Sequence, residues 1–274
     1  MKNQSEKISA EYSKAIKDNK NIVSATGGAK FADYSAHELD SLPEGMTDSS
    51  FGCGNPLATS SVKEGDVVLD LGCGTGLDLL LAAEKVGAKG SVIGIDMNED
   101  MLKKAKENIS KSEFKNIELR NGMIEKLPVD SESIDWVISN CVINLSSDKE
   151  KAFTEIARVL KPNGQMLVSD IVSENMPWWV KKSGILTAAC AGGTISEKLY
   201  LQGLKNAGIT DCSVVARQYY EPTQLASAVV DLLPKFITKL SCCGKGIAEG
   251  MLIKIASPIA KNLWSAKFSG KCGT

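Results

Sequence analysis

A glycine-rich turn that joins a short apolar strand to a helix constrains the fold of this chain more than any other feature. Residues 70–76 read Asp-Leu-Gly-Cys-Gly-Thr-Gly; they close the β-branched segment 67–71 and precede the helical pattern of 77–86. Glycines at a strand-to-helix turn let a ligand approach bare backbone beside a helix N-terminus. The turn therefore predicts a binding site for a nucleotide-like ligand at the edge of a sheet.

Further apolar runs alternate with helical patterns along the chain. We expect strands at 67–71, 91–96, 117–121, 134–139 and 165–170, and helices at 77–86, 99–110 and 149–160. Such alternation builds right-handed strand-helix-strand units around a parallel sheet. We predict a Rossmann-like α/β fold with a mostly parallel, doubly wound sheet and helical additions at both ends. Later strands are expected at 212–219 and 262–271, and helix at 222–261.

The pattern divides the chain into three parts that we expect to form one elaborated domain. Residues 1–56 are a helical and loop-rich lead-in with an amphipathic stretch at 8–16, and 57–175 carry the alternation of strands and helices. Residues 176–274 form a C-terminal region with a mostly helical pattern. We expect the first part to contribute to the acceptor site, and the last part to bind the acceptor and to cap the domain.

Composition excludes several classes of partner. The chain has 274 residues and a formal net charge of -1, with Lys and Arg scattered, so we expect no nucleic-acid partner. The chain has no apolar leader and no run approaching the roughly 18 residues of a membrane span, so we expect a cytoplasmic protein without a membrane partner. In that reducing compartment its eight cysteines are expected to serve metal, redox or catalytic work.

The acid at the end of the second strand strengthens the prediction of a nucleotide-like ligand. Asp96 follows Gly76 by twenty residues, where a carboxylate accepts hydrogen bonds from ribose hydroxyls. The glycine spacing is G-x-G-x-G instead of the dinucleotide pattern G-x-G-x-x-G, and it resembles class I methyltransferases. Asp70 would repel a pyrophosphate and favour a cationic ligand. S-adenosylmethionine carries an ammonium and a sulfonium and no phosphate, so we expect it as the cofactor.

The residues expected at this cofactor lie at the ends of four predicted strands. They are Asp70, Gly72, Cys73, Gly74, Thr75, Gly76, Asp96, Met97, Ile124, Glu125 and Asn140. The segment 122–128 follows the third strand, where this fold usually lines the adenine, and Asn140 ends the fourth strand near the methionine portion. Ile124 also fits a core position, and Glu125 also fits a surface charge.

Three further motifs resemble arsenite methyltransferases. Residues 50–56 read Ser-Phe-Gly-Cys-Gly-Asn-Pro, 140–146 read Asn-Cys-Val-Ile-Asn-Leu-Ser, and 190–193 read Cys-Ala-Gly-Gly. The similarity spans roughly residues 48–220, and the family's arsenic-binding cysteines fall on Cys53, Cys141 and Cys190. The resemblance implies transfer of methyl groups from S-adenosylmethionine to arsenite or its thiol adducts, in arsenic detoxification. It also implies thioredoxin or glutathione as the reductant.

The chemistry of arsenic agrees with such a site. As(III) is soft and pyramidal, so three thiolates suit it better than aspartates or histidines. Its lone pair attacks the methyl group directly, so the acceptor needs positioning but no general base. Cys141 follows the fourth strand at the ligand-binding edge of the predicted sheet. We interpret His37, the chain's single histidine, as a solvated residue of the lead-in.

Two other functions remain open at the level of the sequence. One is a class I methyltransferase of a small organic acceptor such as a quinone precursor. The other is a non-enzymatic thiolate module that binds arsenic or zinc, which would need the cysteines but not Asp96. Cys212 is interpreted as a core residue, whereas Cys242, Cys243 and Cys272 have open roles: arsenic binding, electron relay or none. We expect a monomer.

Overall fold

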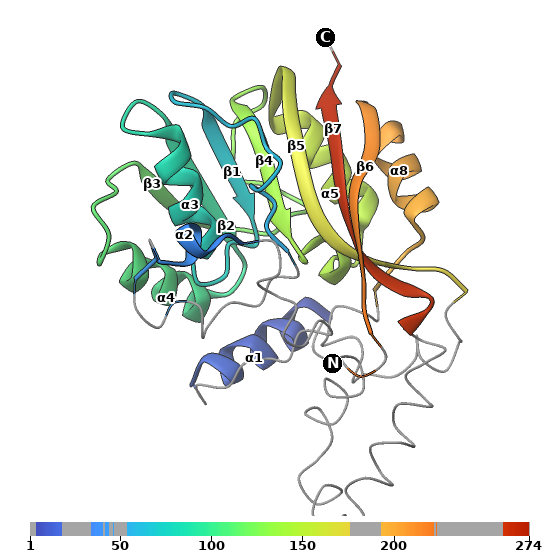
Figure 1. Ribbon diagram of the computed structural model, residues 1–274, viewed down its shortest axis with the longest axis horizontal. Coiled ribbons are helices and arrows are strands. Elements are labelled where there is room, and N and C mark those ends of the chain that lie inside the picture. Colours follow the sequence, from blue (N-terminus) through green and yellow to red (C-terminus); the bar gives the residue numbers. More distant parts are fainter. Residues whose placement is uncertain are drawn as a thin grey trace, which may run out of the picture.

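The protein is built around a seven-stranded sheet with strand order β3-β2-β1-β4-β5-β7-β6 (Figure 1). The computed structural model describes residues 4–17, 34–40, 42, 43, 46, 54–175, 193–221, 223 and 260–273. Five neighbouring strands are parallel: β3 (Ile117–Asn121), β2 (Ser91–Asp96), β1 (Val67–Leu71), β4 (Ile134–Asn140) and β5 (Leu160–Ser173). β7 (Leu263–Cys272) lies antiparallel between β5 and β6 (Ile209–Tyr219).

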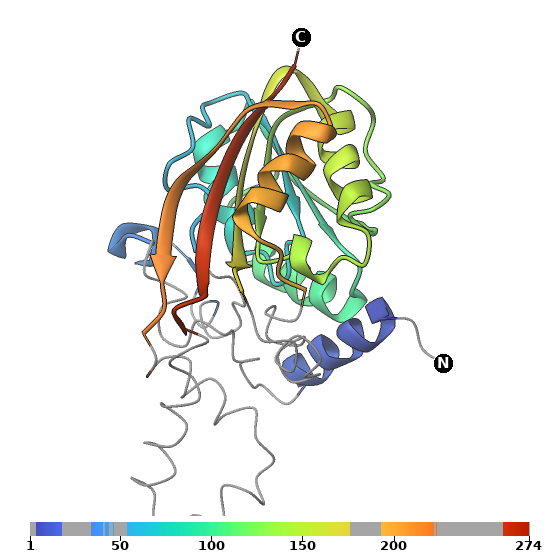
Figure 2. The same ribbon diagram turned by 90° about the vertical axis from the view of Figure 1, so that its right-hand side faces the viewer.

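Helices cover both faces of the sheet and make a three-layer structure. On one face, α5 (Lys149–Val159) and α8 (Glu197–Asn206) bury Phe153 and Tyr200 against strand residues that include Phe268 of β7. The rings of Tyr200 and Phe268 stack with their centroids 4.0 Å apart. On the other face, α3 (Leu77–Val86) and α4 (Glu99–Ile109) pack on β1, β2 and β3. Figure 2 shows α5 and α8 together on one side of the sheet. The predicted Rossmann-like α/β fold is confirmed.

The predicted strands and helices of the alternating region are all present. Three strands and one helix have the predicted bounds, and the other elements differ by a residue or two at one end, except β5. This strand was expected at 165–170 but runs from Leu160 to Ser173. Its extra length comes from pairing: Leu160 pairs with Ile134 of β4, and Ser173 pairs with Leu263 of β7. Long-range pairing of this kind leaves no local sequence pattern.

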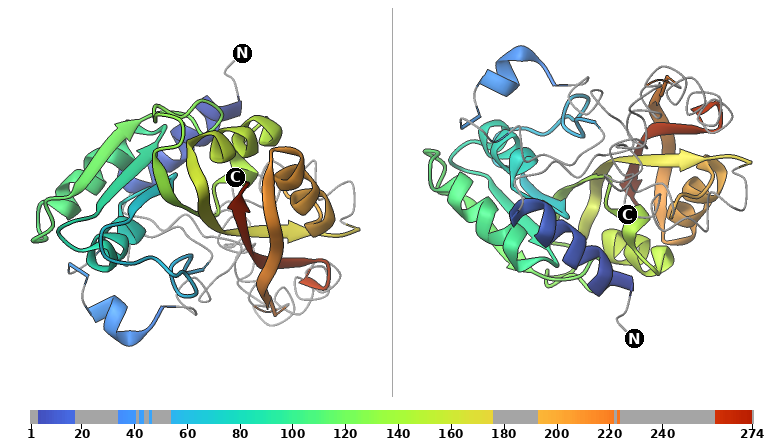
Figure 3. Two further views of the ribbon diagram at one scale, coloured as in Figure 1. Left: turned by 90° about the horizontal axis from the view of Figure 1, so that it is seen from above. Right: turned by 90° about the horizontal axis from the view of Figure 1, so that it is seen from below.

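The carboxyl ends of the parallel strands meet at one edge of the sheet, and the N-terminal helix lies there. This helix, α1 (Gln4–Lys17), contains the predicted amphipathic stretch and contacts α4. Figures 1 and 3 show α1 crossing beneath that edge, and Figure 1 shows the end of β7 at the opposite side of the sheet. The short α2 (Ala36–Asp40) follows in the lead-in and carries His37 on its exposed side. The edge is where ligands of doubly wound sheets bind.

The C-terminal region contributes two strands to the central sheet and helix α8 to the layer that covers it. Its strands β6 and β7 correspond to the expected strands at 212–219 and 262–271, and they complete the sheet begun by residues 67–173. The division at residue 175 stays a prediction. Nearly all of the expected helical segment 222–261 lies outside the described residues. No helix of the described ranges is long and apolar enough to cross a membrane.

Candidate active site

A cavity opens at the carboxyl edge of the sheet and collects most of the predicted site residues. Its lining includes Asp70, Gly72, Cys73, Gly74, Thr75, Asp96, Met97, Ile124, Glu125, Asn140 and Cys141. Gly76 is not part of the lining: it begins α3, with φ 91°. Cys53 and Cys190 lie outside the described residues. The sheet topology therefore brings the glycine turn and the ends of four strands to one place.

The three glycines of the turn have left-handed backbones. Their φ values are 67° at Gly72, 52° at Gly74 and 91° at Gly76, a region that residues with a β-carbon rarely adopt. Space is an additional constraint at Gly72, where a β-carbon would lie 2.2 Å from Cγ2 of Val142. Val142 directly follows Cys141, so the glycine turn packs against the segment that carries the predicted thiolate.

Asp96 is held against the glycine turn by backbone hydrogen bonds. Its Oδ2 accepts from the backbone N–H of Gly74 at 3.0 Å, and its Oδ1 accepts from that of Asn98 at 2.8 Å. Burial raises the pKa of this carboxyl, and the backbone donors oppose that rise. The position agrees with the role predicted for Asp96 at a ribose.

Asp78 is a cavity residue that the sequence reasoning missed. It lies in the first turn of α3, where an acid is ordinarily explained by the helix dipole. Its Oδ1 accepts from the Tyr34 hydroxyl at 2.7 Å, and its Oδ2 accepts from the Asn140 amide at 3.1 Å. Burial is the main cause that raises the pKa of Asp78 to about 6. Burial, followed by the nearby Asp78, also raises the pKa of Asp70 well above its ordinary value.

The charge of the cavity selects the kind of ligand that fits it. Four carboxyl residues line it: Asp70, Asp78, Asp96 and Glu125. The described lining residues include no Lys, Arg or His. A phosphate would meet carboxylates without a compensating cation, whereas a ligand with ammonium and sulfonium charges would be attracted. The residues present therefore fit S-adenosylmethionine and do not fit a dinucleotide.

The loop after β3 forms a further wall of the cavity through residues 122–125. Ile124 lines the cavity and is also packed into the core, so its core interpretation is confirmed and its contact with the cofactor stays a prediction. The carboxylate of Glu125 accepts a hydrogen bond from the Ser146 hydroxyl, which holds this side chain at the cavity. Glu125 is therefore not simply a surface charge. Gly122 is close-packed, because a β-carbon there would lie 2.7 Å from Cδ of Pro128.

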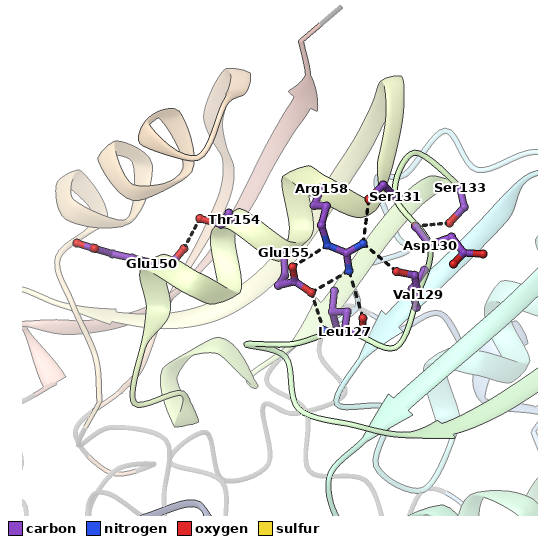
Figure 4. A network of polar contacts seen from close by, with 9 residues as sticks. All are labelled: Leu127, Val129, Asp130, Ser131, Ser133, Glu150, Thr154, Glu155 and Arg158. Carbon is purple, nitrogen blue, oxygen red and sulfur yellow. Dashed lines mark hydrogen bonds and ion pairs between the residues drawn. The ribbon is translucent and has the colours of Figure 1, made fainter.

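An arginine on α5 fixes the following part of the same loop (Figure 4). Arg158 pairs with Glu155 through Nε at 2.7 Å and Nη2 at 2.8 Å. The guanidinium also donates to the carbonyl oxygens of Leu127, at 3.1 Å, and Val129, at 2.9 Å. Glu155 in turn accepts from the Leu127 N–H at 2.6 Å. The loop that lines the cavity is thus hydrogen-bonded to α5, which covers the face of the sheet opposite to α3 and α4.

Cys141 ends the fourth strand in an uncommon backbone conformation. Its φ is 63°, and its N–H donates to the Ser169 carbonyl of β5 at 2.8 Å. The residue is buried and lines the cavity. It is disulfide-bonded in this structure. A left-handed non-glycine residue costs energy that the surrounding structure must supply, and such residues are concentrated at functional sites.

The residue before Cys141 is tied to the lead-in. The Asn140 side-chain amide donates to the backbone carbonyl of Gly54, which also accepts from the Tyr34 hydroxyl at 3.0 Å. Gly54 directly follows Cys53 in the sequence. The lead-in therefore reaches the cavity beside the end of β4.

The segment that follows Cys190 in the sequence packs at Gly193 against the segment that follows Cys141. A β-carbon on Gly193 would lie 2.0 Å from the backbone oxygen of Asn144, so only glycine permits this approach. Asn144 belongs to the 3-10 helix η3 (Ile143–Leu145) and donates through its side chain to buried Asp170 at 2.7 Å. Burial raises the pKa of Asp170 to about 7.

The remaining described cysteines do not form a second thiol site. Cys73, Cys212 and Cys272 are free. Burial raises the pKa of the Cys73 thiol well above its ordinary value, so the neutral thiol is favoured at this position. Within the described ranges no group of three or more His, Cys, Asp or Glu residues is arranged to hold a metal ion. Cys242 and Cys243 lie outside these ranges.

The fold and the cavity together define a protein of the methyltransferase type, and comparison with known sequences agrees. The chain belongs to the methyltransferase-domain family, which it matches over residues 62–208. It is 46% identical over 145 residues to an arsenite methyltransferase of Halobacterium salinarum, covering 53% of this chain and 37% of that protein. It is 36% identical over 118 residues to a demethylmenaquinone methyltransferase of Listeria monocytogenes, covering 43% of this chain and 50% of that protein.

Among solved structures, the chain is similar to an arsenic(III) S-adenosylmethionine methyltransferase of Chlamydomonas reinhardtii. The TM-score is 0.65 at 27% sequence identity, covering 87% of this chain and 72% of that chain. The resemblance to arsenite methyltransferases that the cysteine motifs predicted is therefore confirmed. The chain spans between 37% and 53% of the length of the five curated arsenite methyltransferases it matches.

Proposed function

We propose that this protein transfers methyl groups from S-adenosylmethionine to As(III) held by the thiolates of Cys53, Cys141 and Cys190. The observation that carries the proposal is that chain neighbours of Cys53 and of Cys190 both contact chain neighbours of Cys141, which itself lines the cavity. Asn140 donates to Gly54, and Gly193 packs against Asn144. These contacts involve residues that lie within three positions of each cysteine. The family resemblance supplies the identity of the substrate.

S-adenosylmethionine would occupy the acidic cavity. Asp96 would accept from its ribose hydroxyls, residues 122–125 would line its adenine, and Asp70 and Asp78 would face its cationic portion. Bound there, it supplies an electrophilic methyl group on a sulfonium, so that an As–C bond forms with the arsenic lone pair as an S–C bond breaks. Cys141, Asn140 and the glycine turn line one continuous cavity, which would keep acceptor and donor close.

The protein's part in the reaction is binding and orientation. Three thiolates bind As(III) through sulfur and leave its lone pair available, so no side chain has to remove a proton from the acceptor. The backbone of Cys141 is fixed by its hydrogen bond to Ser169 and by the packing of Val142 on Gly72. Fixed geometry of this kind lowers the entropy lost on reaching the reactive arrangement.

We also propose that the protein works in the cytoplasm with thioredoxin or glutathione as reductant. Cys141 is disulfide-bonded here, and an oxidised sulfur cannot act as a thiolate ligand. A dithiol or glutathione would break that disulfide by thiol exchange before arsenite binds. Pre-reduced protein should therefore bind arsenite without a lag, and oxidised protein only after the reductant is added.

The test is methylation of arsenite in the presence of labelled S-adenosylmethionine and a thiol reductant, followed by speciation of the arsenic. Cys141→Ser and Cys190→Ser are each expected to abolish methylated arsenic while cofactor binding survives. Cys212→Ser is the matched control, because Cys212 is a free cysteine of β6 outside the cavity lining. Unchanged turnover of arsenite in both site variants would overturn the proposal.

The second candidate is methylation of a quinone precursor, which is favoured only by the similarity to a demethylmenaquinone methyltransferase. That activity needs the acidic cavity but not the three thiolates. Offering both acceptors to the wild-type protein and to Cys141→Ser separates them, because quinone methylation would survive the substitution. A non-enzymatic arsenic-binding module would instead keep its whole cellular activity in Asp96→Ala.

A further inference from the structure

Helix α1 forms a wall of the acidic cavity that neither the cysteine motifs nor the glycine turn predicts. Ser5, Ser9 and Tyr12 of this helix line the cavity. They line the same cavity as Met97, Asn98 and Met101, which come within five residues after Asp96 in the sequence. The lead-in was expected to contribute to the acceptor site, but its first helix lies at the Asp96 part of the cavity.

Asn98 connects this wall to the cofactor-binding acid. Its backbone N–H donates to Asp96 Oδ1 at 2.8 Å, and its side-chain Oδ1 accepts from the Met101 N–H at 3.0 Å as the N-cap of α4. Its side-chain Nδ2 donates to the carbonyl oxygen of Ser9 at 2.7 Å and approaches the hydroxyls of Ser9 and Ser13 at 3.0 Å each.

The capping role alone does not explain an asparagine here. An N-cap needs only an acceptor, and Ser and Asp supply one as well as Asn does. The other half of the carboxamide, the Nδ2 group, makes its hydrogen bonds to residues of α1. Asn98 is 3% exposed with α1 in place, so its side-chain N–H group is hydrogen-bonded by α1 in a buried position.

We infer that Asn98 is a positioning residue for S-adenosylmethionine, which holds α1 over the bound cofactor while it orients Asp96. With Asn98 in place, α1 closes the cavity beside the ribose-binding acid. Without the Nδ2 contacts, α1 loses three polar contacts to the N-cap residue of α4 and covers the cavity for a smaller fraction of the time. The inference rests on the proposed binding of S-adenosylmethionine in this cavity, and it adds retention of the cofactor by α1.

Asn98→Ser is the decisive variant. Serine keeps the N-cap acceptor but is too short to reach α1, and it adds no charge beside a cationic ligand. Asn116→Ser is the matched control. The Asn116 side chain also donates to two backbone carbonyls, those of Gly87 at 2.9 Å and Gly90 at 3.1 Å, but it lies outside the cavity lining.

Isothermal titration of each protein with S-adenosylmethionine, and with S-adenosylhomocysteine, gives the first readout. If Asn98→Ser lowers the closed fraction of α1 to about one tenth, the Kd rises roughly tenfold. The Kd of Asn116→Ser should stay at the wild-type value. Hydrogen exchange gives the second readout: the amides of residues 4–17 should exchange faster in Asn98→Ser alone, and added cofactor should restore less protection.

Ser13→Ala keeps the inference falsifiable if Asn98→Ser does not fold. Alanine is the better helix former, so a weaker Kd in this variant cannot come from a loss of helix propensity. We expect a rise of about twofold to threefold, because one of three α1 contacts is removed. Wild-type affinity and wild-type exchange of α1 in the variants that fold would overturn the inference. Failure of the wild-type protein to bind S-adenosylmethionine would instead overturn the proposed function.

Discussion

The side-chain amide of Asn140 donates to the backbone carbonyl of Gly54, so a residue beside Cys141 is bonded to a residue beside Cys53. The two segments are 86 residues apart in the sequence. Three further bonds tie the cluster together, because Tyr34 and Asn140 both contact Asp78 and Tyr34 also donates to Gly54. The predicted cofactor residue Asn140 and the neighbour of the predicted arsenic ligand Cys53 therefore share one hydrogen-bond network.

Replacing Asn140 should separate the two predicted thiolates. In Asn140→Leu the side chain keeps its size but cannot donate, so the segment at Gly54 loses an anchor. We expect the rate of arsenite methylation to fall about 100-fold, as for a small misplacement of reacting groups. Arsenite binding and S-adenosylmethionine binding would be measured separately. Weaker S-adenosylmethionine binding with unchanged arsenite binding would instead show that Asn140 acts on the cofactor alone.

Cofactor affinity should depend on pH through Asp78. Burial raises its pKa to about 6, so the carboxyl is mostly neutral at pH 5 and mostly ionised at pH 7.5. A cationic ligand binds the ionised form better, and the affinity for S-adenosylmethionine should therefore increase as the pH rises through 6. Titrations between pH 5 and pH 8 check this. Asp78→Asn should flatten the profile, and a profile that falls with rising pH would contradict the assignment.

The same shift has the opposite effect on the unliganded protein. A carboxyl whose folded pKa lies above its ordinary value of 3.8 favours folding when it is protonated. This contribution is fully present below pH 3.8 and is lost as the pH rises through about 6. The stabilisation by added cofactor should therefore be larger at pH 7.5 than at pH 5. Thermal unfolding at both pH values, with and without S-adenosylmethionine, measures the difference.

Arg158 should matter to cofactor binding although it does not line the cavity. In Arg158→Lys the bidentate pair with Glu155 and the contacts to Leu127 and Val129 are lost together, because lysine has no planar fork. We expect about fivefold weaker binding of S-adenosylmethionine, which corresponds to about 1 kcal/mol for a loosened loop. The maximal methylation rate at saturating cofactor should change little.

A second bidentate pair provides the control for Arg158. Arg217 donates to Glu197 at 2.8 and 2.6 Å, and the side-chain exposures are 42% and 18%, against 32% and 16% for Arg158 and Glu155. This pair joins β6 to α8 and does not line the cavity. Arg217→Lys should leave cofactor affinity unchanged. Similar losses of affinity in both variants would mean that Arg158 contributes only general stability.

The sequence predicted the frame of the site because the frame depends on local pattern. The strand ends that carry Asp96 and Asn140 follow from apolar runs, and the glycine turn follows from a motif of seven residues. The parallel order of the strands then brings these ends together without further information. Gly72 and Gly74 lie in the glycine turn with left-handed backbones, and Asp96 at the end of β2 accepts from the Gly74 N–H.

The missed residues belong to contacts between distant segments. Asp78 reads as an ordinary acid in the first turn of a helix, and only the approach of Tyr34 and Asn140 makes it part of the site. Asn98 likewise reads as an N-cap, since nothing near it in the sequence indicates Ser9 as its partner. The left-handed backbone of Cys141 has no local signal either, because glycine or asparagine ordinarily marks that conformation.

The packing of Gly72 against Val142 gives a test of how tightly cofactor and acceptor segments are coupled. Gly72→Ala places a β-carbon 2.2 Å from Val142 in a left-handed backbone. The strained backbone should cost about 1–2 kcal/mol and the overpacking about 1–3 kcal/mol of unfolding free energy. Val142→Ala on the glycine background removes two methyl groups of a partly buried side chain and is expected to be the milder change.

Combining the two substitutions separates these costs. In the double variant the contacts to the two γ-carbons are removed, whereas the contact to Cβ of residue 142 at 2.9 Å and the backbone strain remain. Its stability should therefore lie above that expected from adding the two single effects. Denaturant unfolding of the four proteins measures the coupling free energy directly. Additive effects would mean that the turn and the Cys141 segment move independently. A positive coupling would instead mean that a change in the cofactor turn is transmitted to Cys141 through one contact, because Val142 is its immediate neighbour.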